Sequence, residues 1–336
     1  AHETTDGLKK ANSAKRTPPA PDIISPFYGR TRMWFKNLQL YRLAKDKPLA
    51  DSAAFESALT GFVLSPCSAC DPQSLGWVAP TETGTLLHSV NRQWLLALGV
   101  EKRLLPASVV KQFANDRAKQ IEEAEGRRVG RKEMRDLREA LQVELMPRAF
   151  VQRRSTFAWI DPINGWLAVD AAAPAKADEL LEHLHKSIDG FGARLPATQI
   201  SALSAMTAWV AAGEAPHGFT IDQDLELRSP DNAVVRYAKH TLEGDEVRQH
   251  IAQGKVVTRL ALTWRDKISF VLNDKLQIKR LVFLDILKEE NDGLADNEAE
   301  RFDLDFTLMT GELAHLFDDL VAALDGEADI KGDTKG

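Results

Sequence analysis

The sequence predicts an α+β protein with antiparallel sheets and a projecting helical hairpin. Predicted strands outnumber predicted helices and are not separated by regular crossover helices, which argues against a doubly wound parallel sheet. Residues 106–154 carry two stretches of helical apolar spacing on either side of a glycine-bounded turn. Strand-like segments at 155–160 and 165–170 flank an Asp-Pro-Ile-Asn-Gly connection, which is typical of an antiparallel hairpin.

The helical hairpin is predicted from one apolar face on each helix. Gly126 and Gly130 bracket the turn between the helices, and Pro147 ends the second helix. The residues of each face recur at spacings of three and four: Val110, Ala114, Ala118 and Ile121 in the first helix, and Met134, Leu137, Leu141 and Leu145 in the second.

This hairpin region is also the most basic part of the chain. Residues 111–154 hold twelve Lys and Arg against eight Asp and Glu. The functional interpretation is a surface that contacts a phosphate backbone, and the alternative is a solvated pair of helices with Glu–Arg pairs. The candidate DNA-contacting residues here are Lys111, Arg117, Lys119, Arg127, Arg128, Arg131, Lys132, Arg135 and Arg138.

The remaining elements follow from alternation, helical spacing and turn residues. Asp51 is expected to cap a helix that runs to residue 59, and Thr310 is expected to cap one over 311–324. Further helices are predicted over 176–188, 201–212 and 243–253. Strands are predicted from residue 38 and over 76–78, 86–90, 93–98, 219–221, 225–227, 233–237, 256–264, 268–272, 276–284 and 302–306.

These elements suggest six regions along the chain. Residues 1–32 are rich in Lys, Thr, Pro and Ala, and we expect a disordered leader. An N-terminal α+β region is expected over 33–105, and the basic helical hairpin over 106–154. A central β-hairpin with helices covers 155–215, a β-rich region with a closing helix covers 216–324, and an acidic tail over 325–336 is expected to be frayed.

Charge is distributed unevenly. The net charge of the 336 residues is −6, but residues 285–336 hold sixteen Asp and Glu against four Lys and Arg, which leaves +6 on residues 1–284. A basic body with an acidic C-terminal piece is compatible with a nucleic-acid partner. No apolar run reaches the roughly 18 residues of a membrane span, and no secretory signal is present, so we expect a cytoplasmic protein without a membrane partner.

Motifs for common chemistry are missing. The sequence has no Walker A loop, dinucleotide-binding loop or Gly-x-Ser-x-Gly elbow, and we expect no cofactor. Cys67 and Cys70 have Cys-x-x-Cys spacing, but no second ligand pair completes a zinc site. We therefore expect no resident metal and no redox role.

One enzymatic alternative stays open. Asp303 and Asp305, with Glu312 nearby, are a carboxylate cluster that could hold Mg²⁺ for phosphodiester hydrolysis. Phe302, Leu304 and Phe306 alternate with the aspartates, so a half-buried strand that turns both aspartates to water explains the pattern without a metal.

A second basic surface is predicted in the C-terminal β-rich region. Arg259 and Lys267 lie in or beside strands whose alternate residues are apolar, so one face of that sheet would be basic, and Lys279 is a further candidate in the same region. No helix-turn-helix, zinc finger or RNA-recognition signature accompanies it. Two basic surfaces without a catalytic constellation favour a protein that binds the nucleic-acid backbone without sequence preference and is not an enzyme.

Several short motifs follow one another in order from residue 33 to about residue 324. They lie at residues 33–38, 41–43, 76–78, 105–106, 110–112, 147–150, 159–161, 164–165, 169–170, 254–258 and 308–313. Together these motifs resemble the RdgC family of bacterial recombination-associated proteins, and Met33 lies where that family usually begins.

The resemblance implies a non-enzymatic DNA-binding protein of the cytoplasm and nucleoid. Its elongated, multi-lobed subunits would form a ring-shaped homodimer that encircles duplex DNA and restrains RecA-dependent recombination, with single-stranded DNA as a second candidate ligand. A two-fold ring needs two self-complementary contacts per subunit. Phe150, after the Pro147 stop, is the candidate anchor of one contact, and Lys239 and His240, at a predicted turn, are candidates for the other.

Overall fold

The computed structural model describes residues 33–44, 49, 51–68, 71–284 and 295–328. The segment predicted as a disordered leader, Cys70 and the last eight residues of the predicted tail lie outside the described residues. The structure is mixed α+β, as predicted, and its strands form one large antiparallel sheet.

Among the described residues the sheet has twelve strands, and every pair of these strands is antiparallel. Its main path runs β2-β4-β5-β6-β1-β12-β11-β10-β8-β9, while β3 pairs with β4 and β7 with β1. The strands are β1 (Leu38–Leu43), β2 (Gln73–Val78), β3 (His88–Val90), β4 (Gln93–Leu104), β5 (Phe150–Asp161), β6 (Trp166–Asp170), β7 (Ala193–Arg194), β8 (Phe219–Arg228), β9 (Val234–Tyr237), β10 (Val256–Trp264), β11 (Ile268–Asn273) and β12 (Ile278–Phe283).

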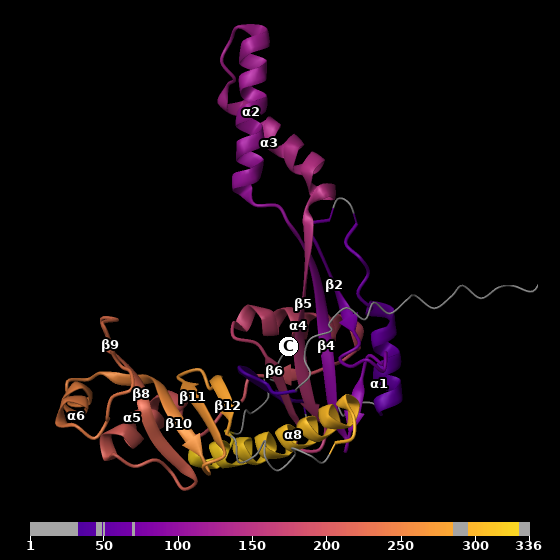
Figure 1. The fold of residues 1–336 in the computed structure, drawn as a ribbon. Helices are drawn as coiled ribbons and strands as arrows, with labels where there is room; N and C mark the ends of the chain where they lie inside the picture. Colours follow the sequence, from indigo (N-terminus) through magenta and orange to yellow (C-terminus); the bar gives the residue numbers. More distant parts are fainter. Residues whose placement is uncertain (1–32, 45–48, 50, 69–70, 285–294, 329–336) are drawn as a thin grey trace, which may run out of the picture.

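The helices lie on the sheet or project from it (Figure 1). Asp51 caps the first helix as predicted, because its carboxylate accepts a hydrogen bond from the Ala54 amide. The helices are α1 (Ser52–Leu59), α2 (Ala107–Glu125), α3 (Arg131–Leu145), α4 (Pro174–Ser187), α5 (Ala202–Ala212), α6 (Asp245–Ala252) and α8 (Glu298–Ala323).

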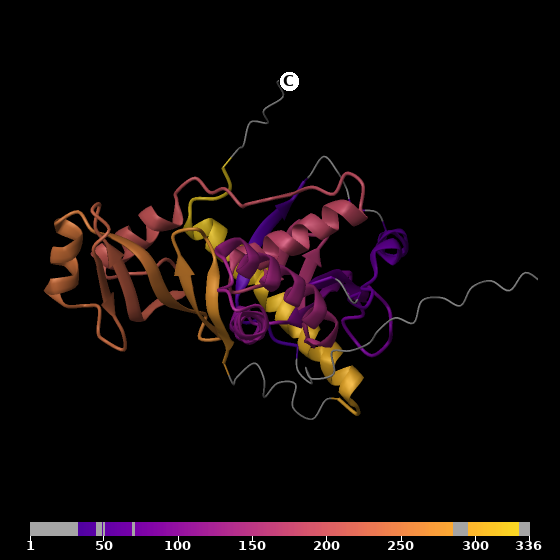
Figure 2. The same cartoon turned by 90° about the horizontal axis from the view of Figure 1, so that it is seen from above.

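The described part of the chain has the outline of an L (Figure 1). Strands β4 and β5 pair over eleven residues, from Trp94 opposite Ile160 to Leu104 opposite Phe150. Helices α2 and α3, called the helix pair below, continue from the outer end of this ribbon and form the long arm. Figure 2 looks down this arm and shows the C-terminal strands extending away to one side.

Two halves of the sheet meet at one narrow junction. β1 and β12 share a single register pair, Leu38 opposite Ile278. Helix α8 spans this junction: Phe317 packs against Trp159 and Trp166 of the N-terminal half, with ring centroids 5.7 and 5.2 Å away. Asp319 of the same helix accepts a hydrogen bond from Trp264 Nε1 of the C-terminal half at 2.8 Å. Helix α8 therefore holds the halves together.

The helix expected over residues 311–324 is present, but the prediction for the residues before it was wrong. Residues 302–306 belong to α8 and form no strand, and Thr310 lies inside the helix, where its hydroxyl donates to the Phe306 carbonyl. The true N-cap is Asn297, which accepts from the Glu300 amide. Five residues with alternating polarity cannot distinguish a strand from a helix whose apolar positions continue at helical spacing. Within the described residues, no helix combines the length and apolar composition needed to cross a membrane.

Some predicted boundaries also change. β4 and β5 each have twelve residues, so residues 150–154, expected in the helical region, begin a strand. β8 is one irregular strand where two short ones were predicted. The start of the predicted frayed tail is held in place, since the Ala328 amide donates to the Ala197 carbonyl and Arg42 contacts Glu327.

Candidate nucleic-acid interface

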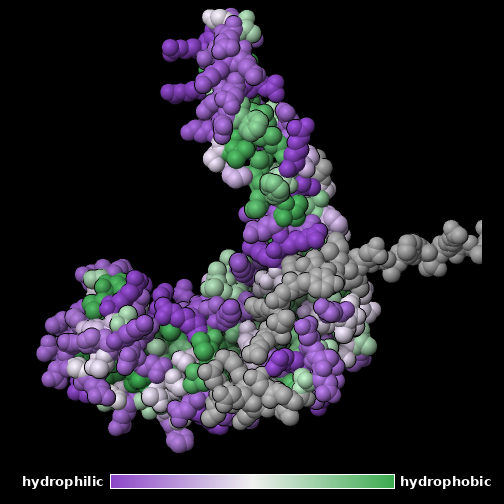
Figure 3. Space-filling model, in the orientation of Figure 1, coloured by the Kyte–Doolittle hydropathy of each residue, from purple (hydrophilic) through white to green (hydrophobic). Residues whose placement is uncertain are grey.

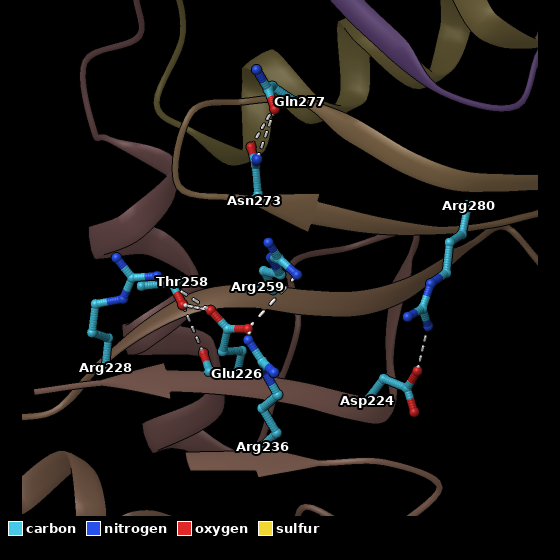
Figure 4. Close-up of polar contacts among 9 residues, drawn as sticks. All are labelled: Asp224, Glu226, Arg228, Arg236, Thr258, Arg259, Asn273, Gln277 and Arg280. Carbon is cyan, nitrogen blue, oxygen red and sulfur yellow. Dashed lines mark hydrogen bonds and ion pairs between the residues drawn. The ribbon is translucent and has the colours of Figure 1, made fainter. Parts of the chain in front are cut away.

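A row of charged residues crosses the C-terminal half of the sheet. Glu226 of β8 lies opposite Arg236 of β9 on one side and opposite Arg259 of β10 on the other. Directly opposed residues of antiparallel strands project from the same face, and Figure 4 shows these side chains gathered there. The other face is apolar, because Leu225 and Leu227 are buried in the core that α5 and α8 cover.

Glu226 is the centre of this row. Its side chain is only 5% exposed, and three arginines approach it. Arg236 Nε donates to Oε2 at 2.8 Å, while Arg259 Nη1 lies 3.7 Å from Oε2 and Arg228 Nη2 lies 3.6 Å from Oε1. The Thr258 hydroxyl donates to Oε1 at 3.0 Å. We call Arg228, Arg236 and Arg259 the arginine cluster.

The surroundings keep Glu226 ionised. Burial alone would raise its pKa, but hydrogen bonds from Arg236 and Thr258 and the charges of Arg259 and Arg236 outweigh burial. The net effect is a pKa below the ordinary value of a glutamate. One carboxylate therefore faces three guanidinium groups, which leaves a charge of +2 at one point of the sheet.

The arginine cluster is accessible to a ligand. The side chains of Arg228, Arg236 and Arg259 are 45, 69 and 58% exposed. Beside them, Arg280 pairs with Asp224 at 2.9 Å and is 74% exposed (Figure 4). Exposed guanidinium groups are well suited to bind phosphate oxygens, because their planar fork can donate two hydrogen bonds at once.

The three residues predicted on this sheet fall into two groups. Arg259 belongs to the arginine cluster, and Lys279 lies close enough for the Arg259 charge to act on it. The pKa of Lys279 is lowered, first by burial and then by Arg259, and its Nζ donates to the Ala172 carbonyl. Lys267 lies elsewhere, at the β10–β11 turn, where it bonds Glu312 of α8 at 2.6 Å.

The candidate residues of the helix pair are exposed but differ in their partners. Arg117 lies 3.7 Å from Glu144, Arg127 lies within 2.8 Å of both Glu125 and Glu133, and Arg135 lies within 3.9 Å of Asp136 and Glu139. The other six have no carboxylate within 4.0 Å among the residues that the structure describes: Lys111, Lys119, Arg128, Arg131, Lys132 and Arg138.

An exposed apolar surface lies where the helix pair joins the β4–β5 ribbon (Figure 3). Phe150, the proposed dimer anchor, is 86% exposed there. Its register partner Leu104 and its neighbour Val151 are each 43% exposed, and Phe113 of α2 is 48% exposed. Phe150 is therefore not part of the hydrophobic core.

Lys239 and His240, the candidates for the second dimer contact, are exposed in the loop after β9. Lys239 adopts a positive φ of 53°, and its amide donates to Asp224 Oδ1 at 3.0 Å. His240 lies 3.7 Å from Glu246. The loop is thus fixed to β8 while both side chains point away from the core.

The carboxylates of the nuclease alternative do not converge. All three lie on α8, where residues two apart face different directions and residues nine apart are roughly 13.5 Å apart along the axis. Asp303 contacts His88 at 2.9 Å, Asp305 is 5% exposed, and Glu312 bonds Lys267. No group of three or more potential metal ligands occurs within the described residues.

Sequence reasoning missed Glu226 and Arg228. A signal was present, since Asp224, Glu226 and Arg228 alternate with the apolar Leu225 and Leu227 and so share a face. The sequence does not reveal the strand register that places Arg236 and Arg259 opposite Glu226.

Comparisons with known proteins identify the family of this chain. Residues 33–327 match a family model described as "Putative exonuclease, RdgC". The recombination-associated protein RdgC of Janthinobacterium sp. (strain Marseille) is 52% identical over 302 residues, which cover 89% of this chain and all of that protein. Proteins of the same name from Dechloromonas aromatica and Herminiimonas arsenicoxydans are 50 and 51% identical over 88% of this chain and 98 and 99% of their own lengths. The sequence, the extent of the match and these identities show that the chain belongs to the RdgC family.

Proposed function

We propose that this protein binds duplex DNA through the phosphate backbone, without sequence preference. The observation that carries this proposal is the arginine cluster, in which three exposed guanidinium groups share one carboxylate. The six basic residues of the helix pair that have no carboxylate partner among the described residues provide a second surface for the same chemistry. Neither surface includes a recognition helix or zinc finger that would read base edges.

We further propose that two subunits form a ring that encircles the DNA. The exposed Phe150 and its apolar neighbours, where the helix pair joins the β4–β5 ribbon, are the candidate patch for one self-complementary contact, and Lys239 and His240 are the candidates for the second. A closed ring would bring the basic surfaces of both subunits around one duplex. The same proposal places the protein on the nucleoid.

Binding is tested by titrating duplexes of scrambled sequence with purified protein across a range of salt concentrations. We expect log affinity to fall linearly with log salt, by about 0.9 per phosphate neutralised, with little change between sequences. A strong preference for one sequence, or no binding at low salt, would contradict the proposal.

We also propose that the bound ring restrains RecA-dependent strand exchange. The names of the relatives place them in recombination, and a protein that occupies the duplex can block RecA there. A strand-exchange reaction with RecA should slow as this protein is added. A variant with Arg228, Arg236 and Arg259 changed to Ala should restore the rate. Equal inhibition by both proteins would show that DNA binding through this surface is not the cause.

A further inference from the structure

The arginine cluster contains an arrangement that charge alone does not explain. Three guanidinium groups repel one another, yet all lie within 3.7 Å of one buried carboxylate. A surface selected only for positive charge gains nothing from a buried glutamate at its centre, because the glutamate cancels one of the three charges.

We infer that Glu226 is a positioning residue: it holds Arg228, Arg236 and Arg259 in a preassembled cluster that binds the phosphates of a nucleic-acid backbone. This inference rests on the proposed DNA-binding function and deepens it, since it assigns the phosphate contact to one set of residues on the polar face of β8, β9 and β10.

The backbone fixes the position of the carboxylate. Glu226 lies on a central strand between two register partners, and the Leu225 and Leu227 side chains on either side are anchored in the core. The Thr258 hydroxyl donates to Oε1, and Arg236 Nε donates to Oε2, so both oxygens are held. The carboxylate cannot turn away without losing these hydrogen bonds.

The guanidinium groups keep donors for a ligand. Arg236 contributes only its Nε to the carboxylate in a hydrogen bond, and Arg228 and Arg259 stay at 3.6 and 3.7 Å. A guanidinium has five N–H donors, so most remain available. Arginines that are already ordered lose less conformational freedom on binding, which favours affinity for a phosphate.

If Glu226 positions the arginines, Glu226→Gln should weaken DNA binding, whereas if only the net charge matters, it should strengthen DNA binding. This change removes one negative charge, so charge counting predicts tighter DNA binding. If Glu226 positions the arginines, they spread apart and binding weakens, by about tenfold for each charge-assisted hydrogen bond to phosphate that no longer forms. The slope of log affinity against log salt should also become shallower by about one.

Two further variants separate the effect of the lost charge from the effect of the lost positioning. Glu214→Gln removes the same charge from an exposed position just after α5 and should leave binding unchanged or slightly tighter. Thr258→Val changes no charge but removes one donor to Glu226, and should weaken binding less than Glu226→Gln does. Thermal melting of each variant checks that it is folded, and Thr258→Val carries the test if Glu226→Gln does not fold.

Inorganic pyrophosphate, as a second ligand, tests this inference independently of the proposed DNA binding. If the wild-type protein binds no DNA, the proposed function fails, and NMR of the arginine Nε–H groups during titration with inorganic pyrophosphate decides the inference. Shifts at Arg228, Arg236 and Arg259 that disappear in Glu226→Gln would support it. The absence of such shifts, or DNA binding by Glu226→Gln as tight as wild type, would overturn it.

Discussion

The helix pair and the polar face of the C-terminal sheet are both basic, but the hydrophobic cores beneath them differ in size. The arginine cluster lies on a sheet backed by the larger hydrophobic core, and a buried carboxylate lies at its centre. The helix pair has a small core of its own, with Val110, Ala114 and Leu141 as its buried members, and its charges lie on exposed helix surfaces. A count of charges alone does not describe this difference.

The largest effect on stability is expected from a substitution in the hydrophobic core that supports the C-terminal sheet. Trp264 is fully buried, and its Nε1 donates to Asp319 of α8. Trp264→Ala should lower the free energy of unfolding by about 3–5 kcal/mol, because it leaves a cavity in the core and removes one hydrogen bond to Asp319. Urea denaturation measures this, and a loss below about 1 kcal/mol would show that α8 does not depend on this contact.

Leu141→Ala should act locally. Leu141 is buried between α2 and α3, and its truncation should cost about 2–3 kcal/mol within the helix pair. Because few other contacts support these helices, we expect faster amide hydrogen exchange in α2 and α3 and unchanged exchange in β8 and β10. Val143→Ala, at a 69% exposed site of the same helix, is the control. Uniformly faster exchange would mean that the arm and the sheet unfold together.

A substitution at Phe150 should affect dimer formation but not the stability of the fold. At 86% exposure its truncation removes little from the core, so Phe150→Ala should melt within a few degrees of wild type. If it anchors a dimer contact, the dimer dissociation constant should rise by about thirtyfold or more, the cost of a hot-spot aromatic. Analytical ultracentrifugation measures this constant, with Ile163→Ala, 53% exposed, as the control. An unchanged constant would remove Phe150 from the interface.

Within the helix pair, unpaired charges should matter more than paired ones. Changing Arg131, Lys132 and Arg138 to Ala should reduce the salt slope of DNA binding by about 2.7. Changing Arg117, Arg127 and Arg135 to Ala removes the same charge, but these side chains must first leave their carboxylates to bind phosphate. The paired set should therefore have the smaller effect, and equal effects would show that ion pairing does not limit these residues.

The smallest effect concerns acid stability. The folded-state pKa of Glu226 lies below its ordinary value, so its ionised form stabilises the fold above the unfolded pKa of about 4.3. This contribution is lost as the pH falls through the folded-state pKa. The stability difference between wild type and Glu226→Gln should be largest near neutral pH and shrink below about pH 4. Thermal melting across this range measures it, and a difference that grows on acidification would contradict the assigned shift.

Local patterns in the sequence predicted much of the fold but not the connections between distant elements. The spacing around Ala114 and Leu141 predicted two helices, and Asp161 to Gly165 predicted the β5–β6 turn, because these signals depend on neighbours in the chain. The misreading of residues 302–306 came from a short window inside a 26-residue helix. The arginine cluster depends on the register of β8, β9 and β10, which no single strand encodes.

The most direct test of encirclement compares closed circular with linear duplex DNA. The protein is bound to each at low salt, the salt is then raised, and the protein that remains bound is measured, with the mass of the free protein recorded in solution. An encircling dimer should stay on closed circles and leave linear DNA through its ends. Equal release from both DNAs would contradict encirclement and would leave surface binding by the two basic regions.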